Sequence, residues 1–186
     1  MRQALGVADN EVMILHSSNL RPVKRIDLLL ETLARVRPRD AFKLVILAGG
    51  SFEPYVKDVQ RLGLQDRVMV REKVNEIEDY LQAADLGLFT SETESFCLSI
   101  LEAMYFGCPS VARRAGGIPE VVDDNVSGLL VPTDNPDELA RAIESLIQDP
   151  KRRVTMGEAA QYRARKHFSA EAIVPRYEAL YRRVCG

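Results

Sequence analysis

Short apolar runs alternate with helix-like segments along this 186-residue chain, and this alternation constrains the fold more than any other feature. The clearest runs are VMILH at 12–16 and KLVILA at 43–48, which are apolar at nearly every position. Strands of this kind are buried on both faces of a sheet, and strands separated by helices pair in parallel through right-handed crossovers. The sequence therefore predicts a Rossmann-like, doubly wound α/β domain.

The length and the remaining elements fit one such domain over residues 1–186. Helical spacing dominates after residue 135, and the last helix carries Pro175 in its second turn, where we expect a bend. The expected strands lie at 12–16, 43–48, 68–70, 85–90, 110–112 and 129–131. The expected helices lie at 22–37, 53–62, 76–84 and 96–106, and three more begin near 136, 150 and 170.

Composition excludes several classes of protein. Lys and Arg total 25 and Asp and Glu 27, so the chain lacks the basic excess that nucleic-acid binding needs. No uncharged apolar stretch reaches about 18 residues and no signal peptide is visible, so we expect a cytoplasmic protein. Cys97, Cys108 and Cys185 are odd in number and match no zinc pattern, and only His16 and His167 accompany them. We therefore expect reduced thiols and no metal site.

The junction after the first expected strand is rich in cations. Residues 17–25 read SSNLRPVKR, and Pro22 is well placed to open the following helix. Arg21, Lys24 and Arg25 would then lie in its first turn, where each cation is unfavourable by about 0.3–1 kcal/mol. In an open parallel sheet, ligands bind at this carboxyl edge. The three cations indicate either a bound anion such as phosphate or side chains that are solvated or paired with acids elsewhere.

The junction at 90–98, TSETESFCL, also follows a strand and opens a helix. That helix contains Glu102 within the apolar segment ILEAMYF. A carboxylate in such surroundings needs a partner. Ligand hydroxyls could serve, and so could an internal cation such as Lys24.

A third junction, RAGGIPE at 114–120, contains two adjacent glycines. Glycine permits a tight turn and lets another group approach the backbone closely. The sequence leaves open whether Gly116 and Gly117 form a plain turn or contact a ligand.

Several blocks together resemble a known family. Glu94 and Glu102 within ESFCLSILEAMYFGCPSVA, followed by GGIPEVV and GLLV, resemble the C-terminal domain of the retaining group-one (family four) glycosyltransferases, which use nucleotide diphosphate sugars. In order and spacing the resemblance extends over residues 12–184. SNLRPVKRIDLLLETLARV and FSAEAIVPRYEALYRRV are similar to members that join N-acetylglucosamine to L-malate in the bacillithiol pathway. The implied architecture is one half of a GT-B fold.

The resemblance also implies roles for individual residues. Lys24 would contact the donor diphosphate, Glu102 would accept the ribose hydroxyls, and Glu94 would bind hydroxyls of the transferred sugar. Lys24 and Glu94 are therefore the expected catalytic residues, and the nucleobase would lie near Lys73 and Val74. Backbone N–H groups would complete the donor cradle at Ser95, Phe96, Cys97 and Leu98.

This chain departs from the family pattern at two of these positions. The family usually has arginine where Asn19 stands, and Arg21 or Arg25 would substitute for it at the donor. It usually has glycine where Cys97 stands. His16 is not matched to the histidine that the family places near the reacting sugar.

The expected function is donor binding in a metal-independent, retaining glycosyltransferase that uses a UDP-linked sugar, with N-acetylglucosamine as a candidate and no cofactor. The N-terminal acceptor-binding half is absent from the sequence, so we expect the chain alone to be inactive. The alternative is a stand-alone nucleotide-sugar-binding module. An unrelated flavodoxin-like domain is disfavoured, since neither an acidic phosphoacceptor nor an aromatic flavin platform is evident.

The final helix has an apolar stripe that in the family faces the other half. Without that half, we expect the stripe either to repack on this domain or to form a patch that drives self-association. Its residues are Tyr177, Leu180, Tyr181 and Val184.

Overall fold

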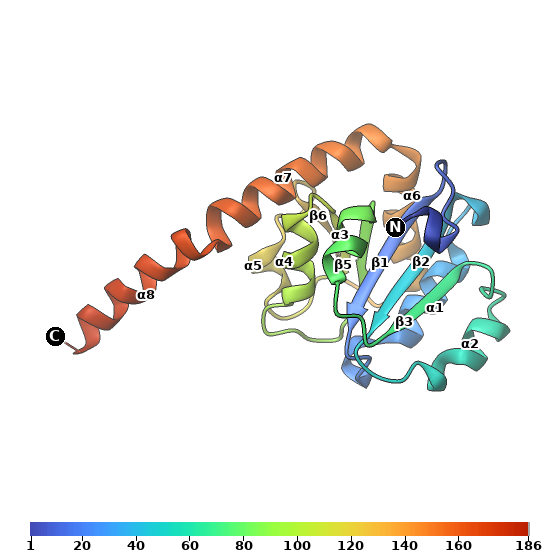
Figure 1. Cartoon of the computed structure of the whole chain (residues 1–186), viewed down its shortest axis with the longest axis horizontal. Helices are drawn as coiled ribbons and strands as arrows, with labels where there is room; N and C mark the ends of the chain where they lie inside the picture. Colours follow the sequence, from blue (N-terminus) through green and yellow to red (C-terminus); the bar gives the residue numbers. More distant parts are fainter. Residues whose placement is uncertain (186) are drawn as a thin grey trace.

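A computed structural model describes residues 1–185 and shows a six-stranded, fully parallel sheet in the order β3-β2-β1-β4-β5-β6 (Figure 1). Helices cover both faces of this sheet. The strands are β1 Val12–Ser18, β2 Phe42–Ala48, β3 Val68–Glu72, β4 Leu86–Phe89, β5 Ser110–Arg113 and β6 Gly128–Val131. The prediction of a Rossmann-like, doubly wound α/β fold is confirmed.

Eight α-helices and several single 3₁₀ turns connect and follow these strands within the described part of the chain. The helices are α1 Ile26–Arg35, α2 Val56–Arg61, α3 Ile77–Ala83, α4 Leu98–Tyr105, α5 Ile118–Val121, α6 Pro136–Gln148, α7 Pro150–Phe168 and α8 Ala170–Cys185. None of them combines the length and apolar character needed to cross a membrane.

Alternate residues of each central strand enter different hydrophobic clusters. Ile14 and Leu44 pack on the face covered by α1, α2 and α6, whereas Leu15 and Val45 pack on the face that α3 and α4 cover. All four side chains are 0–2 % exposed. Burial on both faces is the reason that these strands are apolar throughout rather than alternating.

The sheet order reverses between β1 and β4. The chain runs outward from β1 through β2 to β3, then returns to β4 and continues outward on the other side through β5 to β6. Ile14 pairs with Leu86 across this point. In open α/β sheets such a reversal leaves a crevice at the carboxyl ends of the two strands, which is where ligands bind.

The expected helix at 22–37 is divided into two parts. The prediction that Arg21, Lys24 and Arg25 lie in the first turn of this helix is therefore wrong. Pro22–Lys24 forms a separate 3₁₀ turn, and α1 begins only at Ile26. Between them Arg25 has a left-handed φ of 50°, and the hydroxyl of Thr90 donates to the carbonyls of both Lys24 and Arg25 at 3.0 Å. This tertiary contact removes Lys24 from the first turn of α1.

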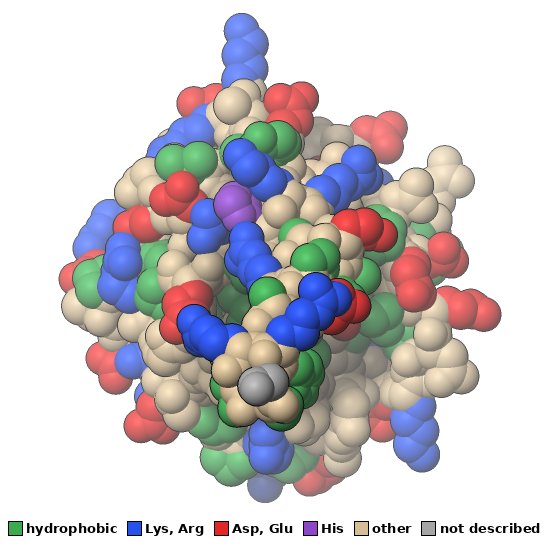
Figure 2. Space-filling view, turned by 90° about the vertical axis from the view of Figure 1, so that its left-hand side faces the viewer, with side chains coloured by type: hydrophobic (Ala, Val, Ile, Leu, Met, Phe, Trp, Pro, Cys, Tyr) green, Lys and Arg blue, Asp and Glu red, His purple; other side chains and the backbone are tan. Residues whose placement is uncertain are grey.

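The final helix leaves the body of the domain. In Figure 1, α7 crosses the domain and α8 continues beyond it toward the C-terminus. The helix is continuous through Pro175, and no residue of α8 within the described chain is buried. Tyr177, Tyr181 and Val184 are 57 %, 63 % and 72 % exposed, so the apolar stripe has not repacked on this domain. Figure 2 views the molecule from the free end of α8 and shows both hydrophobic and basic side chains on the surface of this helix.

Candidate functional site at the carboxyl edge of the sheet

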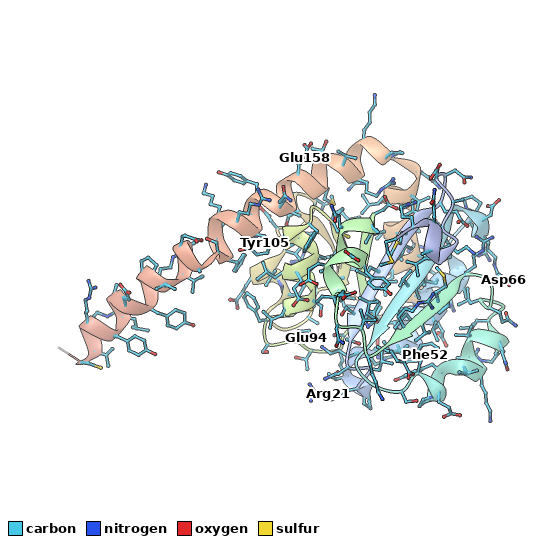
Figure 3. The ribbon with its side chains drawn as sticks, in the orientation of Figure 1. Arg21, Phe52, Asp66, Glu94, Tyr105 and Glu158 are labelled. Carbon is cyan, nitrogen blue, oxygen red and sulfur yellow. The ribbon has the colours of Figure 1, made fainter. Side chains whose placement is uncertain are left out.

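The loops after β1 and β4 meet at the reversal point and bring two predicted site residues together. Lys24 Nζ, from the first loop, donates to Glu94 Oε1, from the second, at 2.5 Å. Ser91 Oγ donates to the same carboxylate oxygen at 2.7 Å. The Lys24 and Glu94 side chains are only 16 % and 11 % exposed, so the pair is held mostly out of solvent. Glu94 is labelled at this edge in Figure 3.

A hollow of about 450 Å³ opens beside this ion pair. The first two N–H groups of α4, those of Leu98 and Ser99, have no carbonyl partner within the helix, and the positive end of the helix dipole faces the same space. The wall therefore joins a cation, a carboxylate and backbone donors in one place. The residues that line it are Ser18, Asn19, Lys24, Glu94, Ser95, Phe96, Cys97, Leu98 and Ser99.

Two glycines hold the Glu94 loop in position. A Cβ at Gly116 would lie 2.0 Å from the carbonyl oxygen of Glu94, and one at Gly117 would lie 2.1 Å from that of Ser95. Gly117 N also donates to the Glu94 carbonyl at 2.7 Å. Gly116 and Gly117 thus form a turn, closed by Ile118 N donating to the Ala115 carbonyl at 3.1 Å, and the group that approaches this turn closely is the chain's own backbone.

Left-handed backbone conformations concentrate in the loops at the carboxyl edge of the sheet. Among the described residues, five that are not glycine have positive φ, and four of these lie in loops at the carboxyl edge: Leu20, Arg25, Lys73 and Cys97. Such conformations are costly for side chains with a Cβ and cluster at functional sites. Cys97, with φ 68°, is the residue that directly precedes α4.

The thiol of Cys97 lines the hollow without being reactive. Burial and, to a smaller extent, the nearby Glu94 carboxylate raise the pKa of Cys97 to about 12. A thiolate is the nucleophilic form of cysteine, so at neutral pH this side chain contributes shape and not nucleophilic chemistry.

Glu102 lies one helical turn beyond Leu98 on α4 and lines a neighbouring hollow of about 660 Å³ with Glu78 and Arg165. Burial, with a smaller contribution from Glu78, raises the pKa of Glu102. Lys24 pairs with Glu94 and not with Glu102. Within residues 1–185 no ion pair is found for Glu102, so the internal cation expected as one alternative is not its partner.

The remaining predicted site residues do not line the first hollow. Arg21 is exposed, and Arg25 is engaged by Asp27 at 2.9 Å, a hydrogen bond that raises the pKa of Arg25. Lys73 follows β3 in a left-handed conformation. Val74 packs against the cluster that includes α3.

Sequence reasoning missed three serines, namely Ser18, Ser91 and Ser99. Ser18 and Ser99 line the hollow, and Ser91 holds Glu94. Their place directly after strands or at the start of a helix was visible, but serine is common in such positions as a turn or cap residue. Only the tertiary contacts distinguish these three.

Comparison with known proteins identifies the class. The chain matches the family model described as glycosyl transferases group 1 over residues 1–163, and it belongs to that family. The predicted group-one glycosyltransferase domain is confirmed.

Individual relatives extend the comparison. The chain is 32 % identical over 182 residues to N-acetyl-alpha-D-glucosaminyl L-malate synthase of Bacillus anthracis, covering 97 % of this chain and 48 % of the relative. It is 33 % identical over 172 residues to D-inositol 3-phosphate glycosyltransferase of Kribbella flavida, covering 86 % and 41 %. The chain thus spans about half the length, or less, of these relatives.

Solved structures give the same result. HepE of Anabaena in complex with UDP and glucose superposes with a TM-score of 0.89 at 33 % identity, over 98 % of this chain and 51 % of that one. Sucrose-phosphate synthase from Thermosynechococcus elongatus gives 0.88 at 27 % identity, over 98 % and 48 %. The fold is therefore that of one half of a GT-B glycosyltransferase.

Proposed function

We propose that this chain is the nucleotide-sugar-binding half of a retaining glycosyltransferase. The observation that supports this most is the Lys24–Glu94 pair, which lies 2.5 Å apart in a hollow at the start of α4. A cation and free backbone N–H groups suit a diphosphate, and an adjacent carboxylate suits sugar hydroxyls. One wall can thus hold both parts of an activated sugar.

In this proposal the departing diphosphate is stabilised without a metal. Lys24 and the N–H groups at the start of α4 offset the negative charge that develops as the bond to the sugar breaks, which is electrostatic preorganisation. Glu94 is already fixed by Lys24 and Ser91, so it orients the sugar hydroxyls with little loss of side-chain entropy. Lys24 and Glu94 are accordingly the proposed catalytic residues.

The nucleoside would extend from this hollow toward Glu102. Glu102 is one turn away along α4 and its pKa is raised by burial, and donation from two ribose hydroxyls would stabilise its ionised form. Lys73 and Val74, which lead from β3 to α3, would then lie by the base. Asn19 and the backbone of residues 95–98 would complete the donor site, with Arg21 at its outer edge.

The relatives support a UDP-linked donor. HepE is solved with UDP and glucose, and the Bacillus anthracis relative is named for an N-acetylglucosaminyl product. N-acetylglucosamine or glucose is therefore the sugar to test first. The three free cysteines fit the cytoplasmic location that the proposal includes.

Calorimetry with the 186-residue chain tests donor binding. We expect UDP-glucose or UDP-N-acetylglucosamine to bind more tightly than the GDP and ADP analogues. Lys24→Met, Glu94→Gln and Glu102→Gln should each weaken binding about 10-fold or more, which corresponds to about 1.4 kcal/mol. The exposed Lys57→Met and Glu158→Gln are the matched controls.

The outcomes separate the parts of the proposal. Absence of binding to every nucleotide sugar would contradict the function. Loss of binding in Lys24→Met with none in Glu102→Gln would contradict only the ribose assignment.

Transfer of the sugar requires an acceptor site, and we propose that an N-terminal half supplies it. The chain alone should give no product, and pairing it with the acceptor-binding half of a relative should give turnover with retained anomeric configuration, read by NMR of the product. Donor binding without turnover in every such pairing would favour the stand-alone binding module.

The exposed stripe of α8 is the surface that we propose such a half covers. In the chain alone it is a candidate for self-association, because Tyr177, Tyr181 and Val184 are more than half exposed. Sedimentation should then show concentration-dependent dimers that Tyr181→Ser weakens. A strict monomer at all concentrations would exclude self-association through α8.

A further inference from the structure

A buried imidazole lies directly behind the hollow. His16 and Ser18 are two residues apart on β1, so their side chains are on the same face of the strand. His16 is 0 % exposed. Its Nδ1 lies 2.8 Å from the carbonyl oxygen of Leu88 on β4, and its Nε2 lies 2.8 Å from Ser18 Oγ. Ser18 in turn lines the hollow beside Lys24 and Glu94.

The partners of His16 determine where each proton lies. A carbonyl oxygen can only accept, so Nδ1 must carry the proton that is donated to Leu88. In a neutral ring Nε2 is then an acceptor, and the Ser18 hydroxyl must donate to it. Leu20 N also donates to Ser18 Oγ, at 3.2 Å. The single proton of Ser18 is therefore directed away from the hollow, and only a lone pair remains on the hollow side.

The neutral state of His16 follows from its surroundings. Burial is the main cause that lowers the pKa of His16 to about 4; the Lys24 cation acts in the same direction, while the hydrogen bond to Leu88 and the Glu94 carboxylate act in the opposite direction. The Phe89 ring, whose centroid is 5.7 Å from that of the imidazole, adds an apolar neighbour. Near pH 7 the ring thus stays uncharged.

We propose that Ser18 is a specificity-determining acceptor in the donor site and that His16 is the positioning residue that makes it one. An acceptor repels phosphate oxygens, which are acceptors themselves, and binds an O–H or an amide N–H. This inference rests on the proposed function and refines it: Ser18 contacts the transferred sugar, whereas Lys24 and the start of α4 contact the diphosphate.

Paired affinities for UDP and for the UDP-sugar test the assignment. Ser18→Ala removes the acceptor and should weaken UDP-glucose or UDP-N-acetylglucosamine by about 3- to 10-fold while changing UDP less than 2-fold. Ser17→Ala, on the opposite face of β1, is the control and should change neither. An equal loss for both ligands, or no loss for either, would overturn the assignment of Ser18 to the sugar.

NMR of the imidazole nitrogens tests the role of His16 without any ligand. In a His167→Gln background a single histidine remains, and its spectrum should show a protonated Nδ1 and an unprotonated Nε2 from pH 5.5 to 8, unchanged by the UDP-sugar. A ring that takes up a proton when the sugar nucleotide binds would overturn the inference, because Ser18 could then donate to phosphate.

His16→Asn separates positioning from folding. Its amide can still donate to the Leu88 carbonyl but offers Ser18 no acceptor at the place of Nε2, so the fold should persist while the preference for UDP-sugar over UDP falls by the same factor as in Ser18→Ala. An unchanged preference would contradict the positioning role. Failure of the wild-type chain to bind any nucleotide sugar would instead refute the proposed function, which is a distinct result.

Discussion

The carboxyl edge of the sheet and the final helix are built in opposite ways. At the edge, Lys24, Glu94 and Ser91 are linked to one another and largely buried, and two glycines leave room for the loop that carries them. On α8 no residue of the described chain is buried, and Tyr181 is 63 % exposed. The first region is organised by contacts within this chain, whereas the second presents an apolar surface that this chain does not cover.

The largest effect that tests this contrast is expected at Gly116. Gly116→Ala would place a Cβ 2.0 Å from the Glu94 carbonyl at a φ of +52°, so the loop must move. We expect a loss of about 4 kcal/mol or more in unfolding free energy, or a folded protein that no longer binds the donor. Gly6→Ala is the matched control, because Gly6 also has positive φ (+61°) but open space around it, and it should cost about 1–2 kcal/mol. Equal costs in the two variants, measured by urea unfolding, would show that the loop is not tightly packed.

The next effect concerns pH and the imidazole behind the hollow. Burial lowers the pKa of His16 to about 4 from an ordinary 6.5, so the unfolded chain binds the proton first as pH falls. Stability should be unaffected above pH 6.5 and should decrease by about 3 kcal/mol between pH 6.5 and 4. The difference between wild type and His16→Asn isolates this contribution from the carboxylates, and His167→Gln should retain it. Parallel pH curves for wild type and His16→Asn would contradict the assignment.

A smaller effect is expected when the ion pair is broken. Lys24→Met leaves the Glu94 carboxylate without its cation in a mostly buried place, and we expect a loss of about 2 kcal/mol in urea unfolding. Lys24→Met with Glu94→Gln should recover much of this stability without recovering donor binding. The exposed Arg61–Asp58 pair is the control, and Arg61→Met should cost less than about 0.5 kcal/mol. If Lys24→Met and Arg61→Met lowered the unfolding free energy by similar amounts, the Lys24–Glu94 pair would be no different from an ordinary surface pair.

The smallest effect is expected on α8. Tyr181→Ser should change the unfolding free energy of the chain by less than about 0.5 kcal/mol, since the side chain has no core to leave. A loss comparable to that of a buried residue would show that α8 packs on the domain in solution and would erase the contrast between the two regions.

Much of the fold could be predicted from local pattern. The apolar runs at 12–16 and 43–48 mark β1 and β2, and capping residues mark the starts of α6 and α7 through Asn135 and Asp149. The division at Arg25 was not predictable, because the hydrogen bonds that fix it come from Thr90, 65 residues away. The apolar stripe of α8 was visible as well, but the sequence left open whether it repacks on this domain or stays exposed, and the structure shows it exposed.

The site was predicted in part for the same reason. Lys24 and Glu94 were expected at one edge of the sheet, and they do meet there. Glu102 was expected to line the same site as Lys24 and Glu94 but lines a separate hollow. The reason is that Glu102 lies one helical turn further along α4 than Leu98, which lines the first hollow. The roles proposed for Ser18 and His16 depend on the carbonyl of Leu88, which belongs to another strand.

The sequence by itself determined the strands, most helices, the family and the edge at which we propose that the donor binds, because these depend on periodicity and short motifs that lie within one segment. Only the tertiary structure decided which charged groups pair, which glycines make room for the Glu94 loop and which way the proton of Ser18 points. These depend on atoms from distant segments that meet only when the sheet has formed, and no local pattern encodes that meeting.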